Sequence, residues 1–160
     1  MWVTAYTDAS YLSRKNIGAW AIFLRSDEGE IKKSGLCPDG YQSATACEVY
    51  AAGMALLWAT KEWKKVSAMQ INSDSEFVVT KLIGDAKLAK SKAIREAQEK
   101  FMVFSKEKNL FLKFKKVKAH GTKEGGRSKL NHHVDQEAKR ALTKGIKSRE
   151  WREKNRDQQD

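Results

Sequence analysis

The sequence predicts an α/β fold in which a five-stranded mixed sheet, an antiparallel meander plus parallel strands, is flanked by helices. Two observations lead to this prediction. The chain begins with three short apolar runs separated by turn signals, as in a meander of strands. Segments of helical period then alternate with further apolar runs, which is typical of a sheet covered by helices.

The meander is predicted over residues 1–8, 17–25 and 30–36. The second run is almost entirely apolar, which favours a buried strand. A turn signal at residues 26–29 (Ser-Asp-Glu-Gly) separates it from the third run. The Pro-Asp-Gly sequence at 38–40 then ends the pattern.

Helices and strands alternate over the remainder of the chain. In the first helical segment Val49, Ala52 and Leu56 recur at the spacing of one helix face, and Ser43 or Thr45 can cap its start. The expected elements are a helix over 43–63, a strand over 66–73, a short helix from Ser75 to about Ile83, a helix over 86–107, a strand over 110–118, a glycine- and lysine-rich loop over 121–130 and a last helix capped by Asn131.

The length of 160 residues fits one compact domain, which we place at residues 1–146. One proline and ten glycines argue against a low-complexity or disordered chain. Residues 147–160 are densely charged with mixed sign, and we expect them to form a flexible tail.

The sequence carries no sign of a membrane or secretory segment. No apolar run approaches the ~18 residues of a spanning helix, and the first six residues lack the basic-then-apolar order of a secretory signal. The two cysteines, Cys37 and Cys47, have no metal-type spacing and favour a reducing compartment. We therefore expect a cytoplasmic protein with both thiols in its core.

The net charge is +11, from 31 basic and 20 acidic residues. Such an excess favours a polyanionic partner, either nucleic acid or an anionic membrane surface. A lysine-rich surface can also serve solubility alone, so the charge does not decide between these possibilities.

Three acidic residues occupy positions where a charge is costly. Asp8 ends the first predicted strand, Asp74 follows the fourth, and Glu48 shares a helix face with Ala52 and Leu56. If the first and fourth strands are parallel neighbours, both aspartates emerge at one sheet edge, where ligand sites of open sheets lie. Clustered carboxylates repel one another and favour a divalent cation, and ligands made only of oxygen suit Mg²⁺ or Mn²⁺.

Five motifs, in the same order along the chain, resemble those of the type 1 ribonuclease H family. One motif alone is weak evidence, whereas five in order over residues 6–138 are a specific signal. The motifs are Tyr-Thr-Asp-Ala-Ser at 6–10, Cys-Glu-Val-Tyr-Ala-Ala at 47–52, Asn-Ser-Asp-Ser-Glu-Phe-Val at 72–78, Val-Lys-Ala-His-Gly at 117–121 and Asn-His-His-Val-Asp-Gln-Glu-Ala at 131–138.

The resemblance implies a ribonuclease H-like fold and cleavage of the RNA strand of RNA–DNA hybrids. Asp8, Glu48, Asp74 and Asp135 would be the metal carboxylates, and His120 the mobile histidine that assists proton transfer or product release. Two Mg²⁺ or Mn²⁺ ions about 4 Å apart would clamp the scissile phosphate, one activating water and the other stabilising the leaving 3′ oxygen. In-line attack would leave 5′-phosphate and 3′-hydroxyl ends.

The resemblance also implies contacts to the hybrid, whose 2′-hydroxyls would distinguish RNA from DNA. The expected substrate-binding residues are Ser10, Asn16, Ser43, Ser75, Lys123, Arg127 and Lys129. Ala44 and Thr45 stand where the bacterial family has asparagines that contact the hybrid. The gap after Gly84 is short, so the family's extra helix and basic protrusion are expected to be absent, as in retroviral ribonuclease H domains. Three lysines can supply part of that charge: Lys87, Lys90 and Lys92.

Two other functions stay open. One is a DNA-cutting nuclease of the same fold, such as a junction resolvase or a transposase-like enzyme, and the other is a catalytically weak hybrid-binding module. The Asp-Ser pair at 74–75 and the histidine loop favour ribonuclease H, and the full set of four acids argues against lost catalysis. We expect a monomer without an organic cofactor or a membrane partner, either free-standing or part of a larger polymerase.

Overall fold

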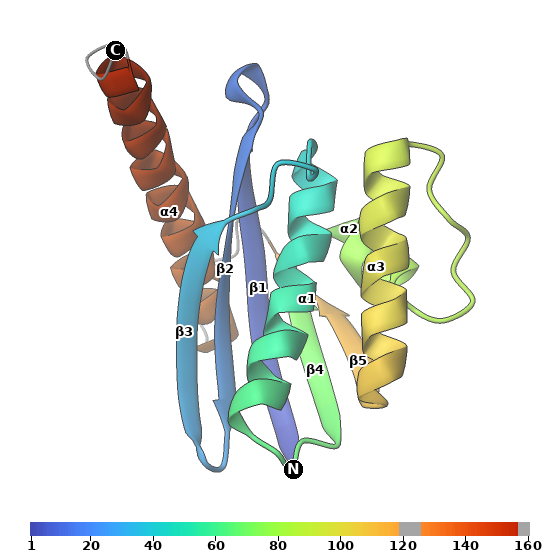
Figure 1. Cartoon of the computed structure of the whole chain (residues 1–160). Coiled ribbons are helices and arrows are strands. Elements are labelled where there is room, and N and C mark those ends of the chain that lie inside the picture. Colours follow the sequence, from blue (N-terminus) through green and yellow to red (C-terminus); the bar gives the residue numbers. More distant parts are fainter. Residues whose placement is uncertain (119–125, 157–160) are drawn as a thin grey trace.

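The protein is described by a computed structural model that covers residues 1–118 and 126–156, without the side chains of residues 126–128. Its elements are β1 (Trp2–Leu12), the 3₁₀ helix η1 (Ser13–Lys15), β2 (Ile17–Ser26), β3 (Gly29–Leu36), α1 (Ala44–Glu62), β4 (Ala68–Ser73), α2 (Glu76–Lys81), α3 (Lys92–Lys108), β5 (Phe111–Lys116) and α4 (Gly126–Arg156). The five strands form one sheet in the order β3-β2-β1-β4-β5. Helices α1 and α3 cover one face and α4 crosses the other (Figure 1), which confirms the predicted layers.

The sheet combines an antiparallel and a parallel half, as the sequence predicts. Strands β1, β2 and β3 form the meander, and the pairing of β1 with β2 extends to Leu12 opposite Ile17. The first strand therefore continues past its predicted end at Asp8, because β2 supplies hydrogen-bond partners for it.

Strand β4 pairs with β1 in parallel, from Trp2 opposite Ala68 to Tyr6 opposite Asn72, and β5 adds a further parallel strand. This pairing confirms the parallel neighbours on which the predicted meeting of the two aspartates depended. Because β4 ends at Ser73, the part of β1 beyond Tyr6 has no strand on this side within the described residues. Asp8 thus lies on an open edge of the sheet.

Two cores hold the helices against the sheet. On the α1 face, small side chains let the helix approach the strands closely, and Leu56 fills the space between them. The fully buried alanines of α1 are Ala46, Ala51, Ala52, Ala55 and Ala59. On the other face Tyr6 and Phe23 pack against Val134 and Ala138 of α4. Each large apolar side chain buried in this way contributes about 1.5–3 kcal/mol.

Cys37 and Cys47 are both buried and free, as predicted for core residues. The thiols lie close enough to hydrogen bond, and this contact together with burial raises the pKa of Cys37. Among the described helices, none combines the length and the apolar character that a bilayer-spanning segment requires.

The predicted start of the long helix at residue 86 is wrong, because α3 begins at Lys92 after Ser91. The preceding segment, residues 82–91, is irregular and contains no helix. Its backbone is held by the fully buried side chain of Gln98. The Gln98 amide donates to the carbonyls of Lys81 (2.8 Å) and Lys87 (3.2 Å), and its oxygen accepts from the N–H of Ala89 (2.9 Å). These bonds replace those that a helix would make.

Helix α4 is longer than predicted at both ends. It begins at Gly126, so residues 126–130 are helical rather than loop, and Asn131 lies within the helix rather than capping it. There the Asn131 side chain donates to the Lys118 carbonyl at 3.1 Å. The helix also continues to Arg156, so residues 147–156 of the expected tail are helical. No glycine or proline follows Gly145 to stop it. The domain boundary at residue 146 stays a prediction.

Candidate metal centre and its surroundings

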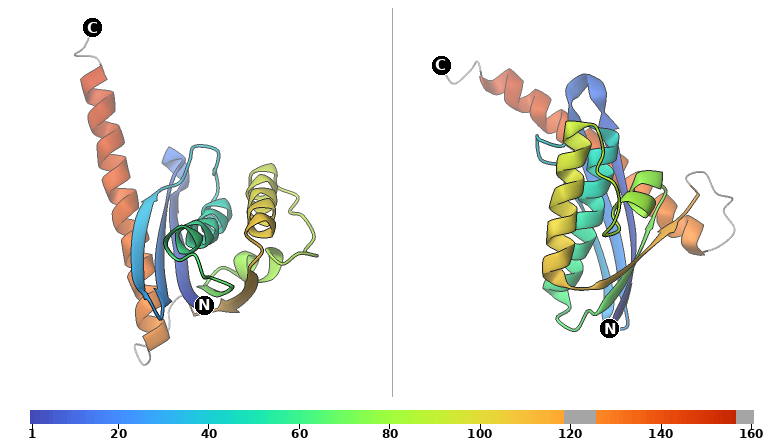
Figure 2. Two further views of the ribbon diagram at one scale, coloured as in Figure 1. Left: turned by 60° about the horizontal axis from the view of Figure 1, so that its bottom comes forward. Right: turned by 90° about the vertical axis from the view of Figure 1, so that its right-hand side faces the viewer.

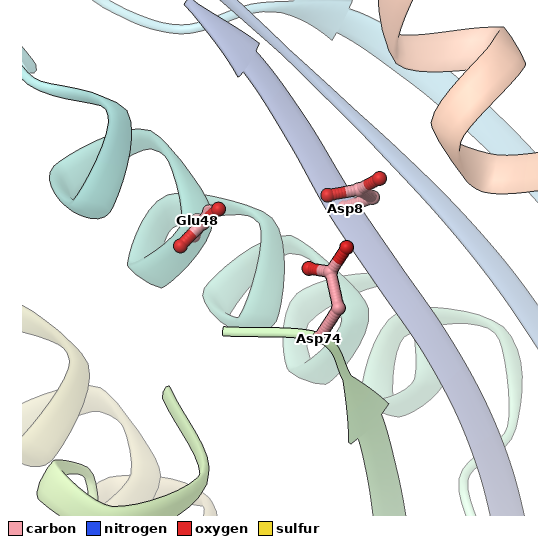
Figure 3. Close-up of side chains that lie close together, drawn as sticks. All are labelled: Asp8, Glu48 and Asp74. Carbon is pink, nitrogen blue, oxygen red and sulfur yellow. The ribbon is translucent and has the colours of Figure 1, made fainter. Parts of the chain in front are cut away.

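Three carboxylates from distant parts of the chain converge at the open edge of β1 (Figure 3). Asp8 lies on β1, Asp74 directly follows β4, and Glu48 lies on α1. One ligand oxygen from each lies within 4.8 Å of the others. Carboxylates at this spacing can share a divalent cation, since oxygen donors suit Mg²⁺ and Mn²⁺.

Two serines hold the chain on either side of Asp74. The N–H of Ser75 donates to Ser73 Oγ at 3.1 Å, which turns the backbone sharply after β4. Ser75 then caps α2, because its own Oγ accepts from the N–H of Val78 at 3.3 Å. Asp74 is therefore fixed in a tight connection rather than on a long loop.

Ser43 sets the position of Glu48 on α1. Its Oγ accepts from the N–H of Ala46 at 2.9 Å, which makes Ser43 rather than Thr45 the cap of the helix. The helix starts so that Glu48 lies in its second turn. A hydrogen bond from Ser75 lowers the pKa of Glu48, but burial has the larger effect and raises it, and the charge of Asp74 raises it further.

Asp8 carries a large electrostatic penalty. The residue is 5% exposed, and burial together with the charge of Asp74 raises its pKa to about 8. The N–H of Ala9, which donates to Asp8 Oδ1 at 2.9 Å, lowers the pKa, whereas Asp135 and Glu48 raise it. At neutral pH the metal-free site therefore retains a proton, and a bound cation would favour the ionised form.

Asp135 approaches the cluster from α4, on the other face of the sheet. Its charge raises the pKa of Asp8, but its oxygens lie outside the group of three carboxylates. Instead, Lys139 Nζ donates to Asp135 Oδ2 at 3.0 Å. This pair was not predicted from the sequence, although a lysine four residues after an aspartate on a helix is a recognisable signal.

The predicted substrate residues differ in what they contact. Ser10 is half-buried on β1 beyond Asp8. Asn16 has a positive φ of 47° after η1, and its Oδ1 accepts from the hydroxyl of Tyr11 at 2.6 Å. Ser75 is buried between α2 and Glu48, and Lys129 is exposed near the start of α4. His120 and Lys123 lie outside the described residues, as does the side chain of Arg127.

Sequence reasoning also missed a buried amide beneath the site. Asn72 is fully buried, and its Nδ2 donates to the Ala5 carbonyl at 2.9 Å. Gln70 Nε2 donates to Asn72 Oδ1 at 3.0 Å. The amide ties β4 to β1 just below the two aspartates. A polar residue in an apolar strand, two positions before an expected ligand, could have indicated this role.

The sequence profile of the RNase H family matches residues 2–143. No curated protein matches the chain.

Solved structures share the fold at low sequence identity. LC11-RNase H1, isolated from compost, has been solved in complex with an RNA/DNA hybrid; the match has a TM-score of 0.71 at 18% identity and covers 90% of this chain and 99% of that one. The N-terminal RNase H domain of a Mycobacterium tuberculosis protein, solved as a fusion with maltose-binding protein, matches with a TM-score of 0.71 at 14% identity, over 92% and 97%. RNase H1 from the halophilic archaeon Halobacterium salinarum matches with a TM-score of 0.67 at 19% identity, over 90% and 99%. These matches confirm the predicted ribonuclease H-like fold.

Proposed function

The chain belongs to the RNase H family, and we propose that it is an endoribonuclease that hydrolyses the RNA strand of RNA–DNA hybrids. The observation that carries this proposal is the carboxylate cluster of Asp8, Glu48 and Asp74 at the open edge of β1. The net charge of +11 supports a nucleic-acid substrate. The hybrid bound to LC11-RNase H1 supports the choice of hybrid among nucleic acids.

The four acids fit a pair of Mg²⁺ or Mn²⁺ ions. All donors are carboxylate oxygens, and the raised pKa of Asp8 indicates a site that lacks positive charge. Bound there, two cations would supply activation of the attacking water and stabilisation of the leaving 3′ oxygen, giving 5′-phosphate and 3′-hydroxyl ends. Asp8, Glu48 and Asp74 would hold them. Asp135 would be the fourth ligand, and its carboxylate would then bind both a cation and Lys139.

The surrounding residues would orient the site and the substrate. Ser75 orients Glu48 by donating its hydroxyl proton to the carboxylate. In the proposed contact with the substrate, the Ser75 hydroxyl can therefore act only as an acceptor. Ser43 accepts from Ala46 and keeps its hydroxyl proton free to donate to a phosphate oxygen of the DNA strand. Ser10 and Asn16, farther along β1 and its turn, would contact the hybrid beyond the cluster.

Residues 119–125 and the first turn of α4 would supply a histidine and positive charge. We assign His120 to proton transfer or product release, as the family resemblance implies. The cationic residues of this region would neutralise backbone phosphates, and they are Lys123, Arg127 and Lys129.

The proposal is tested with end-labelled RNA–DNA hybrid, duplex DNA, duplex RNA and each single strand, with Mg²⁺, with Mn²⁺ and with EDTA. We expect cleavage of the RNA strand of the hybrid alone, and only with a divalent cation. Asp74→Asn should abolish it, because loss of a metal ligand costs roughly a thousandfold or more in rate. Asp27→Asn, an exposed acid in the β2–β3 turn, is the matched control and should keep full activity.

Other results would point to the alternative functions. Equal cutting of duplex DNA would indicate a DNA nuclease of this fold. Tight hybrid binding without cleavage in either metal would indicate a binding module. Cleavage in EDTA would refute the metal mechanism altogether.

A further inference from the structure

The second half of α4 carries an exposed basic stripe that the proposed active site does not use. The stripe consists of Lys144, Lys147, Trp151 and Lys154, all exposed, with Trp151 65% exposed. Their spacing of i, i+3, i+7 and i+10 places them on one face of the helix. Figure 2 shows that this part of α4 projects beyond the ends of the strands.

The opposite face of the same helix is anchored to the domain. A Cβ on Gly145 would clash with the side chain of Leu36, so α4 passes very close to the end of β3. Farther along, Arg149 donates to the carbonyl of Lys15 at 2.7 Å, and Lys15 pairs with Glu150 at 2.8 Å. These contacts reach η1 in the β1–β2 turn and fix the direction in which the stripe faces.

Positive charge dominates the stripe, and two of the carboxylates on this helix are paired with other cations. Glu150 pairs with Lys15, and Glu137 pairs with Arg140. Lys154 also lies near enough to Glu150 to lower its pKa, but less strongly than Lys15 does. Within the described residues, no stripe lysine forms an ion pair at hydrogen-bonding distance.

Trp151 narrows the chemistry of the partner. Lysines alone suit any polyanion, but a largely exposed indole among them offers a flat surface on which an unpaired base can stack. A base within a duplex is already stacked on both sides and cannot use it. Basic residues along a phosphate chain with an interleaved aromatic ring are typical of single-stranded nucleic-acid binding.

The stripe and the candidate active site are connected around α4 rather than along one of its faces. Lys144 follows Asp135 by nine residues, which places it about 14 Å farther along the helix axis and about half a turn around it. A shallow hollow on the helix connects Lys139, the ion-pair partner of Asp135, to the first two stripe lysines. Its lining residues are Gln136, Lys139, Arg140, Thr143, Lys144 and Lys147.

We propose that the stripe on α4 binds the single-stranded nucleic acid that extends from a hybrid held at the carboxylate cluster. The lysines contact successive phosphates and Trp151 stacks on one base. From Lys144 to Lys154 the stripe spans about 15 Å, enough for a few nucleotides. The part of this proposal that concerns a bound hybrid rests on the proposed function. The binding of single-stranded nucleic acid rests on the stripe alone.

Binding of a fluorescent 12-nucleotide oligothymidine in EDTA tests the stripe without the metal site. The variant Lys144→Gln/Lys147→Gln/Lys154→Gln should lower the slope of log affinity against log salt by about 2, since each single-strand phosphate contact contributes roughly 0.7. Trp151→Leu should weaken binding roughly fivefold to a hundredfold and leave the slope unchanged, because stacking is not electrostatic. The control is Lys64→Gln/Lys65→Gln/Lys106→Gln, which removes the same charge from exposed positions after α1 and late in α3.

Cleavage provides the second measurement. Wild-type protein should bind a hybrid with a ten-nucleotide single-stranded extension more tightly than the blunt hybrid, seen as a lower KM. Stripe variants should lose this advantage and cut the blunt hybrid normally. Equal loss in the control variant, or unchanged oligothymidine binding in both stripe variants, would overturn the proposal. If the wild type cuts no hybrid, the proposed function fails, yet the binding measurement still decides on the stripe.

Discussion

Replacing Asp8 by asparagine separates the function of this carboxylate from its cost to folding. Asparagine has nearly the same shape and keeps an oxygen that can accept the 2.9 Å hydrogen bond from the N–H of Ala9. It cannot ionise and is a poor ligand for Mg²⁺ compared with a carboxylate. Asp8→Asn should therefore lose turnover by roughly a thousandfold or more and, without metal, become more stable than the wild type.

The size of the gain follows from the pKa of Asp8. Folding raises it from 3.8 to about 8, so the folded protein binds a proton that the unfolded chain releases. Stability from this group is fully present below pH 3.8 and is lost as the pH rises toward 8. The interval from the unfolded pKa of 3.8 to pH 7 is slightly more than three pH units. At 1.36 kcal/mol per unit, the free energy of unfolding falls by about 4 kcal/mol over this interval.

Urea unfolding in EDTA between pH 4 and pH 8.5 measures this effect for both proteins. The two free energies of unfolding should nearly coincide at pH 4 and diverge as the pH rises. In thermal unfolding at pH 7, the melting temperature of the variant should be roughly ten degrees higher, given about 2–4 °C per kcal/mol for a chain of this size. Mg²⁺ should then stabilise the wild type and leave the variant almost unchanged, because only the wild type retains the full ligand set.

Asp27→Asn is again the control, since this exposed acid lies in the β2–β3 turn away from the cluster. Its unfolding free energy should follow the wild type at every pH. A constant gap between Asp8→Asn and the wild type from pH 4 to pH 8.5 would show that Asp8 does not titrate in this range. The electrostatic account of the site would then be refuted.

Three further predictions concern the surroundings of the site. His120→Ala should slow turnover by about a hundredfold without changing Mg²⁺ affinity, and calorimetric loss of Mg²⁺ binding would instead make it a ligand. The triple alanine variant at Lys123, Arg127 and Lys129 should weaken hybrid binding in Ca²⁺ and reduce its salt slope by about 2–3, whereas an unchanged slope would leave these residues without a phosphate contact. Gln98→Leu should destabilise the protein by about 3 kcal/mol, because two carbonyls and one N–H of the segment around residues 82–91 lose their partner; unchanged urea unfolding would contradict that role.

Periodicity and turn signals predict most of the helices and strands, because the need to bury apolar side chains sets the spacing of those side chains in each element. The strands carry apolar runs, and α1 repeats small apolar residues on one face, so the sheet and its main helix follow from the pattern. The two aspartates could be placed at one edge because parallel strands end on the same side. The pairing of β1 with β4 confirms that step.

The errors occur where side chains rather than periodicity determine the backbone. The pattern predicts a helix in the segment before Lys92, because no local sequence signal indicates that the buried Gln98 side chain binds that backbone. The end of α4 was placed too early because its last turns lack an apolar face. Contacts of Arg149 and Glu150 with Lys15, more than a hundred residues earlier in the chain, hold them instead.

The difference in length between β1 and β4 explains how the cluster can exist. If β4 paired with β1 beyond Tyr6, its backbone would cover the flank of Asp8 and exclude a cation. The chain avoids this because the N–H of Ser75 bonds to Ser73 Oγ, after which Ser75 caps α2 and directs the chain away from the sheet. The same Ser75 orients Glu48. The acids therefore supply the charge, but the two serines beside Asp74 keep the edge open for a substrate to reach it.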